Sequence, residues 1–156
     1  MVMFVDKFME LAYKEAIKAY KEDEVPVGAV IVKDGRVVSC AHNKKEKKKD
    51  CTSHAEIECI RKASKKLGDW YLKDCELYVT LEPCVMCCGA IINARIKKVY
   101  FGARDLKAGA LGGLFNLMDQ KGFNHYFEYE YLVEEKCSQI LKDYFKSKRE
   151  SKGVDK

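Results

Sequence analysis

The spacing of apolar residues changes several times along the chain, and each change predicts a new element. Over residues 6–23 the apolar positions recur every three or four residues with Lys and Glu between them, which is typical of an amphipathic helix. Two β-rich runs, at 27–33 and 36–41, flank the tight-turn dipeptide Asp34-Gly35. The first part of the chain is therefore expected to form a helix and then a β-hairpin.

The rest of the chain alternates between strand and helix patterns. A lysine-rich loop is expected after Asn43 and a glycine-rich loop around 109–113. Helices are predicted over 54–66, 84–95 and 134–148, with Pro83 opening the second, and strands over 76–81, 97–102 and 127–132. A hairpin followed by such alternation predicts an α/β fold, a three-layer sandwich in which helices cover both faces of one mixed five-stranded sheet. Active sites in such folds lie at strand ends and helix starts.

The length of 156 residues, of which 47% are hydrophobic, is enough for one core. We expect one domain over 1–156, with a basic C-terminal helix and tail from about residue 134. No apolar run approaches the length of a membrane span, and the first helix pattern is amphipathic and charged instead of signal-like. These features predict a cytoplasmic protein that has no membrane partner.

The chain has eight cysteines, and three of them cluster at the start of a predicted helix. Cys84 and Cys87 share a helix face, and the positive end of the helix dipole there favours thiolates. Cys88 is a candidate fourth ligand, but it points about 100° away from Cys87 on a regular helix, so we expect it to pack inside. We expect four cysteines outside this cluster to be core thiols, because they lie in apolar or amphipathic stretches: Cys40, Cys59, Cys75 and Cys137.

His54 and Glu56 stand at the start of another predicted helix. Two thiolates and one imidazole give three zinc ligands and leave one tetrahedral position open, as in catalytic zinc sites. Glu56 lies on the side of the helix opposite His54, so we assign it to proton transfer and not to ligation. We therefore predict one Zn²⁺ per subunit on His54, Cys84 and Cys87, where it lowers the pKa of a water from about 15.7 to about 7. By itself, C-x-x-C also fits a redox motif or a structural zinc site.

The pairing of H-x-E with P-C-x-x-C resembles the signature of the zinc-dependent nucleobase deaminases. Four segments resemble the bacterial tRNA-specific adenosine deaminases in particular: EVPVGAV (24–30), TSHAEI (52–57), LYVTLEPCVMC (77–87) and FGARD (101–105). The resemblance covers nearly the whole chain. It implies a cytidine-deaminase-like fold, a homodimer, and the hydrolytic conversion of the wobble adenosine in a tRNA anticodon to inosine.

The resemblance also implies roles for single residues. Glu56 would be the proton donor, Asn43 would lie against the flipped base, and Asp105 would lie against the sugar–phosphate of a neighbouring nucleotide. The RNA-facing closing helix would contribute Phe145, Lys148 and Arg149. Without the resemblance, Asn43 is a turn residue and Asp105 a loop cap.

Three positions depart from the family pattern. Cys51 replaces a proline, Ser53 replaces an alanine, and Gly113 replaces a common serine. None of these changes removes a catalytic group, but they leave the shape of the loops near the substrate open.

Several features fit more than one interpretation. The net charge of +5 is modest, but basic residues gather over 44–49 and 146–156, either as phosphate contacts or as solvated surface. Phe127, Tyr129 and Tyr131 alternate, and could stack on bases or pack on the core. His42 and His125 fit either loop contacts or RNA contacts.

Two rival functions share part of this pattern. A free-base or nucleotide deaminase, of the guanine or cytosine type, would use the same zinc and Glu56 on a small molecule. A non-enzymatic RNA-binding module would use zinc only to hold its fold, and Glu56 argues against it.

Overall fold

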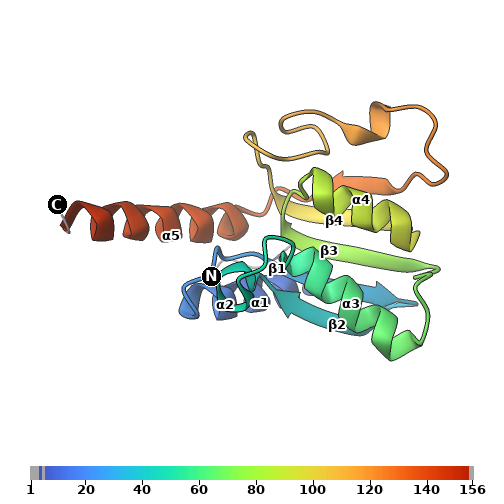
Figure 1. Cartoon of the computed structure of the whole chain (residues 1–156), viewed down its shortest axis with the longest axis horizontal. Helices are drawn as coiled ribbons and strands as arrows, with labels where there is room; N and C mark the ends of the chain where they lie inside the picture. The colour runs from blue at the N-terminus through green and yellow to red at the C-terminus, as the bar shows by residue number, and fades with distance from the viewer. Residues whose placement is uncertain (1–3, 5, 155–156) are drawn as a thin grey trace.

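A mixed five-stranded sheet organises the chain (Figure 1). The computed structural model describes residue 4 and residues 6–154. The elements are α1 (Lys7–Lys21), β1 (Gly28–Lys33), β2 (Arg36–His42), α2 (Lys45–Lys48), α3 (Ala55–Leu67), β3 (Cys75–Leu81), α4 (Val85–Ala94), β4 (Lys98–Ala103), η1 (Leu117–Asp119), β5 (Glu128–Tyr131) and α5 (Glu135–Val154). The strand order is β2-β1-β3-β4-β5, in which β1 is antiparallel to both neighbours and β3, β4 and β5 are parallel. The predicted sheet is confirmed.

The hairpin between β1 and β2 closes at the predicted dipeptide. Asp34 and Gly35 both have positive φ angles, 52° and 74°. Two left-handed residues give the turn whose twist matches that of the flanking strands. Lys33 and Arg36 therefore pair directly across the turn.

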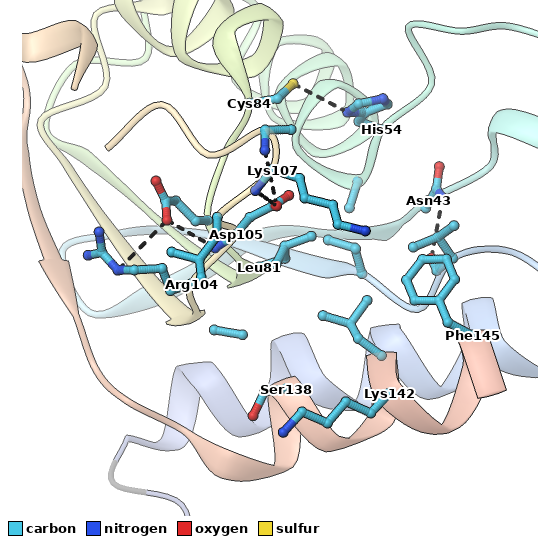
Figure 2. Close-up of a pocket in the computed structure, with 18 of the residues that line it drawn as sticks. Asn43, His54, Leu81, Cys84, Arg104, Asp105, Lys107, Ser138, Lys142 and Phe145 are labelled. Atoms are coloured by element: carbon cyan, nitrogen blue, oxygen red, sulfur yellow. Dashed lines mark hydrogen bonds and ion pairs between the residues drawn. The ribbon is translucent and has the colours of Figure 1, made fainter. Parts of the chain in front are cut away.

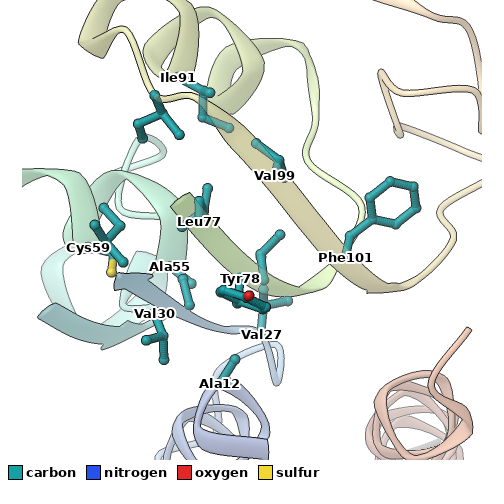
Figure 3. Packing of buried hydrophobic residues seen from close by; sticks show 14 of the residues in the cluster. Ala12, Val27, Val30, Ala55, Cys59, Leu77, Tyr78, Ile91, Val99 and Phe101 are labelled. Atoms are coloured by element: carbon teal, nitrogen blue, oxygen red, sulfur yellow. The ribbon is translucent and has the colours of Figure 1, made fainter. Parts of the chain in front are cut away.

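Helices cover both faces of the sheet, as predicted. Helices α1 and α5 lie on one face, and α3 and α4 on the other (Figures 1 and 3). In β3, Leu77 points toward the α3 and α4 layer, whereas Tyr78 points toward α1 and contacts the Phe8 ring at 5.3 Å. Because both faces are covered, most of this central strand is buried, not only alternate positions.

Helix α1 approaches the sheet very closely. A side chain at Gly28 would overlap the backbone carbonyl of Ala12, and Ala12, Ala16 and Ala19 on this helix are fully buried. Small residues on both elements let the backbones pack directly against each other. This contact holds the hairpin, which ends next to the candidate site.

Two segments differ from the prediction. The lysine-rich segment contains a short helix, α2, because the buried Glu24 carboxylate accepts hydrogen bonds from the backbone N–H groups of Glu46 and Lys47 at 2.9 and 2.8 Å. Helix α5 extends beyond the predicted end at residue 148 and projects away from the sheet (Figure 1). The predicted basic tail includes Lys156, which lies outside the described residues.

The ambiguous aromatic and histidine residues make contacts within the chain. Phe127 is buried in the core, so core packing is confirmed for this residue. Tyr131 is 36% exposed, with its ring stacked on the buried Phe101 at 5.1 Å, and Tyr129 is 37% exposed. The His125 Nε2 atom lies 2.7 Å from the Ile96 carbonyl oxygen, which is the loop contact. His42 lies between two carboxylates of α1 and its C-cap.

The expected core thiols and the membrane prediction can also be compared with the structure. Cys59, Cys75, Cys88 and Cys137 are fully buried, and Cys40 is partly buried against the core. Across residues 4 and 6–154, no helix is both long and apolar enough to cross a membrane.

Candidate active site

Two helix starts bring the predicted metal ligands together. His54 is the N-cap of α3 and Cys84 the N-cap of α4, and neither side chain caps its own helix. Both side chains instead turn toward each other (Figure 2). The His54 Nδ1 atom lies 3.7 Å from Cys84 Sγ and 3.5 Å from Cys87 Sγ. The three donor atoms lie within 4.8 Å of one another and could hold a metal ion.

Cys88 does not belong to this group. Its thiol is fully buried and points to the Pro83 carbonyl oxygen at 3.9 Å. Its sulfur is not among the His54, Cys84 and Cys87 donor atoms that lie within 4.8 Å of one another. The expectation that Cys88 packs inside is confirmed.

The three donors perturb one another. A hydrogen bond with Cys87, followed by one with His54, lowers the pKa of Cys84 to about 4. The hydrogen bond between His54 and Cys84 raises the pKa of His54. The hydrogen bond between Cys87 and Cys84, together with burial, raises the pKa of Cys87. The α4 N-terminus adds a favourable potential for negative charge. The contacts within the group therefore favour the thiolate form of Cys84.

Glu56 lies in the first turn of α3, beside the donor group. Its side chain is buried, and burial raises its pKa to about 7. A carboxyl group with a pKa near neutrality can both accept and release a proton there. The placement thus brings a group that could hold a metal ion next to a carboxyl group that could transfer protons.

These residues form one end of a large cavity. The cavity has a volume of about 990 Å³, and His54, Glu56 and Cys84 line it. Helix α5 lines the opposite side with residues spaced three or four apart: Ser138, Leu141, Lys142, Phe145, Lys148, Arg149 and Lys152. Residues 103–108, together with Asn43 and Lys45, contribute to the remaining wall. Cys87 lies behind the lining, in contact with His54.

Asn43 and Asp105, the two predicted base and sugar contacts, both line the cavity. The Asn43 amide donates to the Val25 carbonyl at 3.3 Å and accepts from the Lys45 N–H at 3.2 Å. Asp105 Oδ1 accepts from the N–H groups of Lys107 and Ala108 at 3.0 and 3.1 Å. Both residues therefore make the local turn contacts that their residue types predict. Their roles toward RNA stay predictions.

The predicted residues of α5 also reach the cavity. Phe145 is 44% exposed, and Arg149 is exposed beside it. Lys148 differs from Arg149, because its Nζ lies 2.6 Å from Asp23 Oδ1 and 5.7 Å from the Tyr144 ring. Arg149 is therefore the more available cation of the pair.

Sequence reasoning missed some residues of the site. Lys142 and Ser138 lie on the cavity face of α5, and the helical spacing of that face is a signal that could have found them. Glu82 and Arg104 also line the cavity. Both lie in segments that carry the family resemblance, but no local spacing indicates what they contact, because their partners are distant along the chain.

Comparison with known proteins agrees with this site. Residues 4–149 match the model of the MafB19-like deaminase family. A tRNA-specific adenosine deaminase of Aquifex aeolicus is 46% identical over 142 residues, which cover 91% of this chain and 94% of that protein.

Two solved structures are also similar. One comes from work on A-to-I editing by tRNA deaminases at the wobble position; it has 44% identity, a TM-score of 0.81, and coverage of 86% of this chain and 98% of the other. The other is a guanine deaminase from Bacillus subtilis, with 32% identity, a TM-score of 0.63, and coverage of 92% and 95%. The fold, the His-Cys-Cys group and the identity over most of its length together show that the chain belongs to the tRNA-specific adenosine deaminases, within the MafB19-like deaminases.

Proposed function

We propose that this protein hydrolyses the wobble adenosine of a tRNA anticodon to inosine and releases ammonia. One observation carries the proposal: the cavity joins the His54, Cys84 and Cys87 group and Glu56 to a helix whose exposed face is basic and aromatic. The identity to tRNA-specific adenosine deaminases and the likeness to a wobble-position tRNA deaminase support the substrate. We assign the protein to the cytoplasm on the basis of this proposed substrate.

The metal in this proposal is zinc, one ion per subunit. With ordinary zinc bond lengths, a tetrahedral ion separates a sulfur and a nitrogen ligand by about 3.6 Å. The two His54-to-sulfur distances, 3.7 and 3.5 Å, agree with that value. When bound, zinc supplies the activation of a water molecule as a nucleophile at neutral pH.

Glu56 moves the protons of the reaction. Its buried carboxylate accepts a proton from the attacking water and delivers protons to the base, whose amino group leaves as ammonia. Burial beside the donor group supports this role, since water would otherwise compete for the carboxylate. The other half of the cavity then has only to hold and orient the base.

The RNA contacts are assigned to the open side of the cavity. Asn43 would orient the flipped base, and Asp105 would meet the sugar–phosphate of a neighbouring nucleotide. Phe145 offers a ring for stacking, and Arg149, with Lys148, offers charge for phosphates. All five residues line the cavity, which supports the assignment.

The proposed assembly is a homodimer through the outer faces of α3 and α4. A groove of about 440 Å³ lies there, lined by Ile60 and Ala90 among others. Trp70 at the groove is 64% exposed, which supports an apolar contact with a second copy. Light scattering after size-exclusion chromatography tests it: a mass of one chain would reject the dimer, and a mass of two chains is expected.

Guanine deamination is the second candidate, because a guanine deaminase is 32% identical over most of the chain. The deciding experiment incubates the purified protein with an anticodon stem-loop that carries adenosine at the wobble position, and measures inosine by mass spectrometry. Matched reactions contain a stem-loop with guanosine at that position, free guanine, free adenine or free cytosine. Inosine from the first stem-loop is expected, without the xanthosine, xanthine, hypoxanthine or uracil that deamination would give in the matched reactions and that the same mass spectrometry detects. Rapid turnover of a free base with none of the stem-loop would reject the proposal.

A further inference from the structure

Glu82 lies between β3 and α4, and its side chain is fully buried. Its carboxylate accepts three backbone hydrogen bonds from one distant loop. Oε1 accepts from the Asp105 N–H at 3.1 Å, and Oε2 accepts from the N–H groups of Leu111 and Gly113, each at 2.9 Å. A buried carboxylate with three such donors holds that loop at a fixed place.

The same loop is also joined to the segment that carries the first metal ligand. Gly109 forms an isolated β-bridge with Cys84, and the Ala110 N–H donates to the Pro83 carbonyl at 2.9 Å. In the chain, Glu82 directly precedes Pro83 and Cys84. One short stretch of chain thus connects the metal-binding group to the loop over residues 105–113.

The loop has glycines where it meets the carboxylate. A side chain at Gly109 would overlap the Glu82 carboxylate, and one at Gly113 would come within 2.7 Å of its Oε1 atom. A side chain at Gly113 would also overlap the Asp105 carbonyl oxygen. The serine that is common in the family at this position would therefore require a different loop shape.

The held loop forms part of the cavity wall. Residues 105–108 line the cavity, and the bonded N–H of Asp105 belongs to the first of them (Figure 2). Arg104 adds a weaker contact to the same carboxylate, with its Nε 3.9 Å from Oε1. Glu82 borders the cavity, but its side chain is fully buried, so it acts on the substrate space through this loop.

We propose that Glu82 is a positioning residue that sets the substrate-facing wall over residues 105–108 relative to the Cys84 segment. It acts on the fit of the base and its neighbouring nucleotide, and it leaves metal binding to His54, Cys84 and Cys87. The inference rests on the proposed function for the identity of the substrate. The arrangement of the loop is independent of that identity.

The test is Glu82→Gln, which keeps the size of the side chain. A glutamine side chain has one acceptor oxygen and one NH₂ group. In place of one carboxylate oxygen, its NH₂ group would face backbone N–H groups, and two donors cannot form a hydrogen bond. We expect faster hydrogen exchange at the amides of Asp105, Leu111 and Gly113, and one metal ion per chain as in the parent. We also expect KM to rise about 10- to 100-fold, because the variant no longer makes buried hydrogen bonds to a charged acceptor, with a smaller change in kcat.

Glu58→Gln is the matched control. Its carboxylate is also buried, but its partners are the side chains of Lys48 and Arg61, away from residues 105–113. The control is expected to leave KM and exchange in the loop unchanged. Gly113→Ala disturbs the contact from the loop side and is expected to raise KM while Glu82 stays intact.

Two results would overturn the inference. One is an unchanged KM and unchanged exchange at the three amides in Glu82→Gln. The other is a loss of metal and stability in Glu82→Gln that accounts for the whole loss of activity, with normal KM in Gly113→Ala. KM is measured on the substrate that the parent protein turns over. If that substrate is guanine and not the stem-loop, the proposed function fails, and the same rise in KM on guanine would still support Glu82.

Discussion

The two sides of the cavity are built differently. On the α3 and α4 side, Glu56 and Cys87 are buried and the donor atoms are fixed by helix starts. On the α5 side, Lys142, Phe145 and Arg149 are exposed on a helix that projects from the sheet (Figure 1). Proton transfer and metal binding need desolvated groups at fixed distances, whereas contacts with phosphates need cations that a large substrate can reach. Changes on the first side should therefore affect chemistry, and changes on the second should affect binding.

The largest effect is expected from the double variant Cys84→Ala, Cys87→Ala. It removes two of three donors, so the chain should lose its metal, all measurable turnover and part of its stability, since metal-binding free energy is partly folding free energy. Metal content by plasma mass spectrometry and the melting temperature measure both losses. The control is Cys137→Ala, a buried thiol away from the cavity, which should keep the metal. Full metal occupancy in the double variant would refute the ligand assignment.

Glu56→Ala should separate chemistry from structure on the same side. The metal content should stay at one per chain, while turnover falls by at least about 10²–10⁴-fold, the usual contribution of a positioned acid–base group. Single-turnover rates with saturating stem-loop measure this loss. A variant that retains most of its activity would remove Glu56 from the mechanism.

The α5 side should respond to salt instead. Arg149→Gln should weaken stem-loop binding and reduce the slope of log affinity against log salt by about 0.7–0.9 for each phosphate that the protein no longer neutralises, with little change in the rate at saturation. Adding Lys148→Gln should change the slope less, because Lys148 already pairs with Asp23 at 2.6 Å.

Binding titrations at several salt concentrations give these slopes. Lys65→Gln is the control, since Lys65 is exposed on α3 and does not line the cavity. A parent protein without any salt slope would place the substrate among uncharged small molecules. In that case the α5 side would have no phosphates to bind, and the contrast between a side for chemistry and a side for RNA binding would have no physical basis.

The same contrast explains what the sequence could predict. His54, Glu56, Cys84 and Cys87 lie within short motifs, and each motif begins a helix whose start is visible in the local pattern. Helix starts gather at one edge of an α/β sheet, so the metal-binding group follows from local rules plus the layer architecture.

The other contacts depend on pairs that are far apart in sequence. Glu82 meets partners 23 to 31 residues later, in a loop without periodicity. The ion pair of Lys148 with Asp23 joins residues 125 apart. No local spacing specifies which distant residues will meet, so these features required the structure.

The smallest expected effect concerns His42, the last residue of β2, which directly precedes Asn43. Its Nδ1 lies 3.1 Å from Glu15 and its Nε2 lies 2.9 Å from Glu22, which joins the end of β2 to α1. The hydrogen bond with Glu15 raises the pKa of His42 above 6.5, and the one with His42 lowers the pKa of Glu15 from 4.5 to about 2. Lys18 and Lys47 face the same carboxylates.

These pKa shifts define a pH window for the stability that the cluster contributes. A raised histidine pKa gives stability that is full below 6.5 and is lost as the pH rises through the folded-state value. A lowered carboxyl pKa gives stability that is full above 4.5 and is lost as the pH falls toward about 2. Both contributions are full between pH 4.5 and 6.5. In that range we expect His42→Gln to lower the free energy of unfolding by about 1–2 kcal/mol, and at pH 9 we expect a smaller loss. Urea unfolding of both proteins at pH 5.5 and 9 measures the difference, and an equal loss at both pH values would show that His42 stabilises the chain by packing and not by charge.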